Sequence, residues 1–300
     1  MSTLFGSVAR AMFCACLTVS LCASATVGAE PTVVPLWSGE IPGPKPDATG
    51  PEGDLPERPG GAPIRRTTNI TAPSLVVYEA PADKRTGAGL IVIPGGGFGY
   101  LTTDLEGSEA CEFFAARGVT CFLLKHRAPT NKQPEPNAGP VLDCRRAVAL
   151  VRERADDWKL ARDRIGVLGF SAGGQVAAVS TFGPGMTDAE AKASRPDLLL
   201  LIYPWGLYLP KEGKLRSDLQ PTAGAPPTFF AQALDDKASL PQGTTGLCAK
   251  LMDLGVPVEL HLYEKGGHGF GIRPVAVPCP SDWPQRAADW LKLREWTVAK

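Results

Sequence analysis

The chain is poor in histidine and carries no excess of charge of either sign. Its 300 residues include 3 histidines, and its 31 lysines and arginines balance its 31 aspartates and glutamates. With no Cys-x-x-Cys spacing either, few side chains are left from which to build a zinc site. The balanced charge gives no indication of a nucleic-acid partner or a membrane surface. We therefore expect no metal, no cofactor and no nucleic acid.

The sequence also lacks a run of apolar residues long enough to span a membrane. One apolar stretch, "AMFCACLTVSLCA" (11–23), is shorter than the roughly 20 residues of a transmembrane helix. It follows Arg10 and precedes small residues that permit cleavage after Ala25 or Ala29, which is typical of a secretory signal peptide. We expect residues 1–29 to be this signal peptide. The mature protein is then secreted or periplasmic, with no membrane attachment.

Cysteine is sparse once the expected signal peptide is removed. Of the 8 cysteines in the chain, those that remain are Cys111, Cys121, Cys144, Cys248 and Cys279. In an oxidising compartment this odd number allows one or two disulfides, whose pairing does not follow from the sequence.

Proline and glycine are concentrated after the signal peptide. The stretch 35–66 is rich in both and has no hydrophobic period. Such a composition predicts an irregular arm that lies over the domain or a flexible lead-in, and it excludes a separate fold. We assign 30–66 to this arm and 67–300 to a single catalytic domain.

Beyond the arm, apolar runs alternate with helical patterns. Strands are expected at 74–80, 89–94, 119–125, 164–170, 197–204, 227–233 and 257–264, and helices at 104–118, 141–158, 244–255 and 282–296. Continuous apolar strands separated by helices favour a mostly parallel sheet covered on both faces. The fold class is therefore α/β, with a doubly wound sheet.

The segment "GVLGFSAGGQVAA" (166–178) joins an expected strand to an expected helix. Its Gly-x-Ser-x-Gly turn forces the serine into a strained backbone conformation and exposes its oxygen above the sheet. Ser171 is therefore a candidate nucleophile.

A serine nucleophile needs a base to remove its proton, and the candidates are His126, His261 and His268. His261 lies within a strand pattern, and His126 precedes the serine in the chain. His268 follows the last expected strand in a glycine-rich loop, which gives the order Ser, acid, His of α/β-hydrolases. The orienting acid is then Asp236 or its neighbour Asp235, with Asp236 favoured.

The glycine run in "IVIPGGGFGY" (91–100) follows another expected strand. Its backbone N–H groups can stabilise an oxyanion, and we choose those of Gly96 and Gly97, together with the N–H of Ala172 behind the serine. The run lacks the Gly-x-Gly-x-x-Gly spacing of a dinucleotide site, and the chain has no Walker A sequence.

Together, "IPGGGFGYL", "GFSAGGQVAA", "LLIYPWG" and "PVELHLYEKGGHGFG" resemble the secreted α/β-hydrolases of the acetyl xylan esterase and feruloyl esterase-like group, a BD-FAE-like family related to dienelactone hydrolases. The resemblance runs from about Leu75 to the C-terminus. It implies an α/β-hydrolase fold with a minimal cap and a triad of Ser171, Asp236 and His268. The implied activity is a serine carboxylesterase for short acyl esters, acetyl or feruloyl, on plant polysaccharides such as xylan.

Two other functions stay open. One is a serine peptidase of the prolyl-oligopeptidase type, and the other is a non-catalytic carbohydrate-binding module with a hydrolase fold. The main insertion available as a lid is 206–225, so the site is expected to be open. Trp205 and Tyr208 are candidates to stack on sugar rings or to serve as ordinary packing residues.

Overall fold

The computed structural model describes residue 1 and residues 32–297, apart from residue 62 and residues 275–278. The expected signal peptide, apart from its first residue, lies outside the described residues. Within these residues, no helix is both long and apolar enough to cross a membrane.

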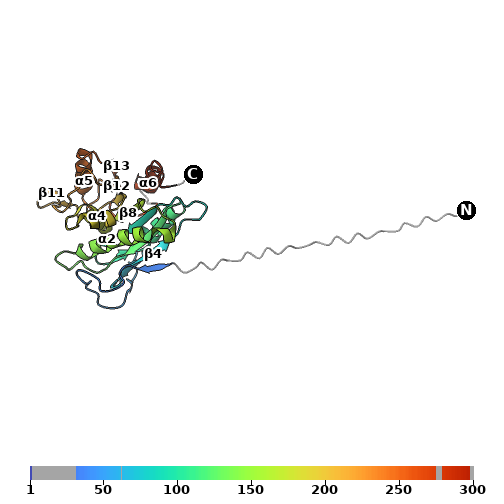
Figure 1. Cartoon of the computed structure of the whole chain (residues 1–300), viewed down its shortest axis with the longest axis horizontal. Helices are drawn as coiled ribbons and strands as arrows, with labels where there is room; N and C mark the ends of the chain where they lie inside the picture. The colour runs from blue at the N-terminus through green and yellow to red at the C-terminus, as the bar shows by residue number, and fades with distance from the viewer. Residues whose placement is uncertain (2–31, 62, 275–278, 298–300) are drawn as a thin grey trace. The chain divides into compact units, whose positions relative to one another are not determined.

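One sheet of eight strands forms the centre of the domain, in the order β1-β4-β7-β5-β8-β9-β12-β13. From β7 to β13 every neighbouring pair is parallel, whereas β4 is antiparallel to both of its neighbours. The order from β4 through β8 to β13 can be followed in Figure 1. The strands are β1 (Val33–Pro35), β4 (Ser74–Tyr78), β5 (Gly89–Ile93), β7 (Thr120–Lys125), β8 (Ile165–Phe170), β9 (Leu198–Ile202), β12 (Thr228–Ala233) and β13 (Val258–Tyr263). The expected α/β class with a mostly parallel sheet is confirmed.

Helices cover both faces of this sheet. Side chains alternate between the two faces along each strand, so a strand that is apolar throughout needs an apolar layer on each side. Ile91 and Ile93 of β5 pack in the core beneath α2 (Ala138–Glu153), α3 (Ser171–Phe182) and α5 (Pro241–Asp253). Leu90 and Val92 of the same strand pack in the opposite core, beneath α1 (Glu109–Ala115) and α6 (Trp283–Lys292). In Figure 1, α5 and α6 lie on opposite sides of β12 and β13.

The elements that the sequence did not predict are mainly short ones, and two of the expected helices are each divided into two shorter elements. The helix expected at 104–118 is divided into a π-helical turn, η1 (Asp104–Ser108), and α1, and the one expected at 141–158 is divided into α2 and a 3-10 turn, η2 (Ala155–Trp158). The elements not expected are β1, which lies in the arm expected to be irregular, together with β2 (Gly53–Asp54), β3 (Arg66–Thr68), β6 (Leu101–Thr102), α4 (Asp188–Ser194), β10 (Tyr208–Leu209), β11 (Lys214–Leu215) and η3 (Cys279–Asp282). Elements of two to seven residues carry too little hydrophobic period to be recognised in sequence.

A buried ion pair fixes the proline-rich arm to the domain. Arg127 follows β7 and Asp143 lies in α2, and their side chains are 1% and 0% exposed at an Nη2–Oδ1 distance of 2.6 Å. Arg127 also donates hydrogen bonds to the carbonyl oxygens of Pro42 and Pro44, at 2.8 and 2.9 Å. The Trp37 indole donates to Asp143 Oδ1 at 3.0 Å. The start of the arm therefore lies against the domain.

The end of the arm enters a second, small sheet. β3 pairs with β2 on one side and with β6 on the other, all antiparallel. β6 begins at Leu101, after a short turn that follows the glycine run at 95–97. The arm is therefore held beside the loop that carries the candidate oxyanion donors.

The described cysteines are not paired. Cys111, Cys121, Cys144 and Cys248 are free thiols, and all four are buried. The disulfides that the sequence allowed are thus absent among these four residues, and the side chain of Cys279 lies outside the described part of the chain.

We expect Asp143→Ala to lower the free energy of unfolding by about 3–5 kcal/mol, because it leaves the Arg127 charge buried without a partner. Urea unfolding followed by tryptophan fluorescence measures this loss. Asp156→Ala is the matched control, since it removes an exposed partner of Arg162 and such pairs contribute little. Equal losses in the two variants would contradict the structural role given to the buried pair.

Candidate active site

The turn that carries Ser171 depends on glycine at two positions. β8 ends at Phe170, and Ser171 begins α3 with a φ of 48°. A Cβ at Gly169 would lie 2.5 Å from the carbonyl oxygen of Gly173, and a Cβ at Gly173 would lie 2.2 Å from the carbonyl oxygen of Ile93. No other residue fits at either place, so the turn expected from the sequence forms with the serine in a positive-φ conformation.

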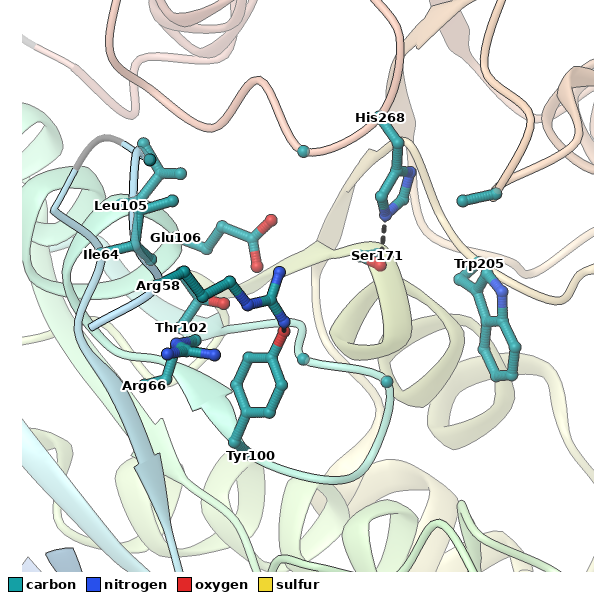
Figure 2. A pocket seen from close by; sticks show the side chains of 15 residues that line it. Arg58, Ile64, Arg66, Tyr100, Thr102, Leu105, Glu106, Ser171, Trp205 and His268 are labelled. Carbon is teal, nitrogen blue, oxygen red and sulfur yellow. Dashed lines mark hydrogen bonds between the residues drawn. The ribbon is translucent and has the colours of Figure 1, made fainter. Parts of the chain in front are cut away.

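Three side chains from distant parts of the chain meet above this turn. Ser171 Oγ lies 2.9 Å from His268 Nε2, and His268 Nδ1 lies 2.8 Å from Asp236 Oδ2. The carboxylate only accepts, so Nδ1 carries the hydrogen and Nε2 is left to accept from the serine hydroxyl. Figure 2 shows the His268 ring directly over Ser171. This is the arrangement in which an imidazole can take a proton from the serine hydroxyl.

The structure separates the two candidate acids. Asp236 is 1% exposed, and its second oxygen accepts hydrogen bonds from the backbone N–H groups of Ala238 and Ser239, both at 2.8 Å. These bonds aim the other oxygen at His268. Asp235 instead accepts a hydrogen bond from Gly267 N–H at 2.8 Å. It therefore holds the loop in which His268 lies, a contact that the sequence did not reveal.

The other two histidines lie elsewhere. His126 is 1% exposed, its Nδ1 lies 3.0 Å from the carbonyl oxygen of Arg127, and burial lowers its pKa. His261 Nε2 lies 2.8 Å from Glu259 Oε1 on β13. Neither lines the pocket at Ser171. In the part of the chain that the structure describes, no group of three or more histidine, cysteine or acidic residues is arranged to hold a metal ion.

The expected oxyanion donors lie close to Ser171. Gly96 and Gly97 have φ values of 132° and 59° and line the same pocket as the serine. A Cβ on Gly96 would lie 1.9 Å from the carbonyl oxygen of Tyr100, so only glycine fits there. Across the described residues, neither amide donates a hydrogen bond to a protein acceptor. Ala172 is the second residue of α3, where N–H groups have no partner inside the helix.

A buried carboxyl that the sequence did not point to connects two sides of the site. Glu106 is 4% exposed, and its Oε2 accepts from Gly95 N–H at 2.8 Å while its Oε1 accepts from the Tyr203 hydroxyl at 2.8 Å. The same hydroxyl accepts from Gly271 N–H at 2.9 Å, and the Tyr203 ring lies edge-on to the His268 ring at 5.1 Å. Burial raises the pKa of Glu106 and that of Tyr203. The glycine loop and the histidine loop are therefore joined through two side chains.

The space above Ser171 is a pocket of about 570 Å³. Residues of the arm, Arg58, Gly61, Ile64 and Arg66, line one wall, and Trp205 lies on the opposite side (Figure 2). The arm thus forms a wall of the pocket. The insertion at 206–225, which the sequence had indicated as the main candidate for a lid, does not line this pocket. Tyr208 lines a neighbouring hollow, which it shares with Trp205.

Part of the chain matches a known protein family. Residues 75–195 match the model of the BD-FAE family. The resemblance noted in the sequence is confirmed by this match.

Two curated relatives of this chain have names that refer to xylan. An acetylxylan esterase of Xylanibacter ruminicola is 28% identical over 62% of this chain and 42% of its own length. Endo-1,4-beta-xylanase B of Butyrivibrio fibrisolvens is 24% identical over 67% of this chain and 35% of its own length. The matched region therefore spans less than half the length of either relative.

Solved structures match more completely. An acetyl ester-xyloside bifunctional hydrolase from Caldicellulosiruptor lactoaceticus is 26% identical with a TM-score of 0.68, covering 91% of this chain and 100% of that one. A thermophilic esterase, Est2, from Thermogutta terrifontis is 21% identical with a TM-score of 0.66, covering 77% of this chain and 91% of that one. At this identity, the second match shows the α/β-hydrolase fold alone.

We expect Glu106→Gln to lower the free energy of unfolding by about 1–3 kcal/mol, because an amide has one acceptor oxygen for the two donors that the carboxyl satisfies. Burial raises the folded-state pKa of Glu106, so its contribution to stability is present below pH 4.5, the ordinary value, and is lost as the pH rises through the folded-state value. The deficit of the variant should therefore shrink as the pH rises.

Denaturant unfolding at several pH values measures this deficit. Glu112→Gln is the control, because Glu112 is exposed on the adjoining helix α1, and we expect a change within about 0.5 kcal/mol. A deficit at Glu106 that is no larger than that of the control would contradict the role of this carboxyl as a link between the loops.

Proposed function

We propose that the protein is a serine carboxylesterase that removes short acyl groups, acetyl or feruloyl-type, from plant polysaccharides such as xylan. The observation that carries the proposal is the continuous chain of hydrogen bonds from Ser171 through His268 to Asp236. It lies at an open pocket, and its serine belongs to the segment 75–195 that matches the BD-FAE model. The printed names of the acetylxylan esterase and of the acetyl ester-xyloside hydrolase support the substrate class.

In the proposed reaction, His268 Nε2 takes the proton from Ser171 Oγ as this oxygen attacks the ester carbonyl carbon. Asp236 stabilises the imidazolium that forms and keeps its ring oriented. The negative oxygen of the tetrahedral intermediate accepts hydrogen bonds from the backbone N–H groups of Gly96, Gly97 and Ala172, each worth a few kcal/mol. The C–O bond to the alcohol then breaks, and the leaving oxygen takes the proton from His268.

Water completes the cycle. His268 removes a proton from a water molecule, the hydroxide oxygen attacks the acyl-enzyme carbonyl, and Ser171 leaves with that proton. The products are the free carboxylic acid and the alcohol of the carbohydrate. The half-exposed His268 ring, 28% exposed as a side chain, is accessible to the water that this second step needs.

The shape of the pocket supports a substrate attached to a polymer. Its walls are the arm and Trp205, and the indole is 37% exposed beside the serine. An exposed aromatic face of this kind offers apolar area to a sugar ring. We further propose that residues 1–29 are removed during export, since a polysaccharide substrate lies outside the cell.

Two alternatives make different predictions. A carbohydrate-binding module needs no hydrogen-bonded Ser-His-Asp chain, so the geometry favours an enzyme. A serine peptidase of the prolyl-oligopeptidase type would cleave a dipeptide amide faster than an acetate ester.

We expect the purified protein to hydrolyse 4-nitrophenyl acetate and to release acetate from acetylated xylan, and Ser171→Ala to lower kcat/KM by about 10⁴-fold or more. Ser217→Ala, at an exposed serine outside the pocket, is the matched control and should retain the wild-type rate. Equal rates in wild type and Ser171→Ala would refute the mechanism, and faster cleavage of a dipeptide amide would favour the peptidase.

A further inference from the structure

The two arginines in the pocket wall point to the chemistry of the substrate. We propose that the ester substrate carries a carboxylate, which Arg58 and Arg66 bind while the ester lies at Ser171. This inference rests on the proposed esterase function and narrows it to acidic substrates. The carboxylate belongs either to a uronic acid of the carbohydrate or to a dicarboxylic acyl group, and the experiment below separates these sources.

Both arginines are held at the pocket by one tyrosine. Arg58 Nη2 donates a hydrogen bond to the Tyr100 hydroxyl at 3.2 Å. The guanidinium carbons of Arg58 and Arg66 lie 6.0 and 5.6 Å from the centre of the Tyr100 ring. In Figure 2 the Arg58 side chain extends from the arm into the pocket, and Arg66 lies on the same side of the pocket as Tyr100. Both cations therefore lie against the same ring in the pocket wall.

Neither of these cations has an acidic partner among the residues that the structure describes. The neighbouring Arg65 pairs with Asp54 at 2.7 Å, and Arg273 pairs with Asp104 and Glu109. Arg66 is bonded instead to the carbonyl oxygen of Pro56. Two like charges near one ring repel each other, and a bound anion would offset that repulsion. Guanidinium groups are also the side chains that match the geometry of a carboxylate.

The other ionisable groups that line the pocket do not neutralise the positive charge of Arg58 and Arg66. The acidic one is Glu106, whose two oxygens already accept hydrogen bonds from Gly95 N–H and from Tyr203. Even an ionised Glu106 supplies one negative charge against the two guanidinium groups. His268 is the remaining base, and it becomes positive during the proposed reaction. The pocket is thus suited to an anionic ligand.

The experiment compares acids with neutral amides of the same shape. For the carbohydrate source, the substrates are an acetylated methyl glucuronoside and its uronamide. For the acyl source, they are 4-nitrophenyl monosuccinate and 4-nitrophenyl succinamate. We expect kcat/KM for the acid to exceed that for the amide about tenfold or more in one of the two pairs. The preference should decrease between about 0.05 and 0.5 M NaCl, because salt screens exposed charges.

Variants then test whether Arg58 and Arg66 cause the preference for the acid over the amide. Arg58→Gln and Arg66→Gln should each bring the acid-to-amide ratio toward one, and the double variant should abolish it. Arg65→Gln is the matched control, because it removes an arginine from the adjacent position without touching the pocket, and it should retain the ratio. Because each ratio is measured on one preparation, loss of folded protein cancels.

Each outcome decides a different claim. A preference in the glucuronoside pair identifies an acidic carbohydrate, and a preference in the succinate pair identifies an acidic acyl group. Ratios near one in both pairs, with the amides hydrolysed, would overturn the carboxylate site and leave the esterase intact. If no ester is hydrolysed, the proposed function fails. Calorimetric binding of both substrate pairs to Ser171→Ala then tests the site, which equal affinities for acid and amide within both pairs would overturn.

Discussion

The close approach of β8, α3 and β5 at the Ser171 turn is the constraint on which the site depends. The backbone at Gly173 lies so near to β5 that a Cβ would reach 2.2 Å from the carbonyl oxygen of Ile93. This contact allows the helix to start directly at the end of the strand, with Ser171 at a φ of 48°. A larger residue at Gly173 would push the helix away and move the hydroxyl out of reach of His268. The contact between Ser171 and His268 therefore depends on backbone packing.

Around this turn, buried and half-buried polar groups fix loops that have little secondary structure. Asp235 holds the histidine loop through Gly267 N–H, and Glu106 and Tyr203 join that loop to the glycine run. Arg127 fixes the arm through the carbonyls of its prolines. Buried groups of this kind are costly unless every donor finds an acceptor. The same bonds that satisfy them therefore keep the pocket walls in one arrangement.

The sequence allowed the sheet to be predicted, and also that Ser171 and His268 lie close together, because each of these features leaves a local signal. Buried strands appear as apolar runs, and the serine turn has its two glycines. Asp236 could be narrowed only to a pair, since adjacent carboxylates have the same local pattern and only folding decides which meets the imidazole. Glu106 lay in an ordinary helical pattern. The contribution of the arm depends on pairing of β3 with β6 and on Arg127, contacts between segments far apart in the chain.

Covalent labelling with a fluorophosphonate tests whether His268 activates Ser171, because this reagent reacts with a serine only when its hydroxyl is activated. We expect one label per molecule, mapped by peptide mass spectrometry to Ser171, and no label in the folded variant His268→Gln. A folded wild-type protein that takes up no label, or equal labelling of wild type and His268→Gln, would show that His268 does not activate Ser171.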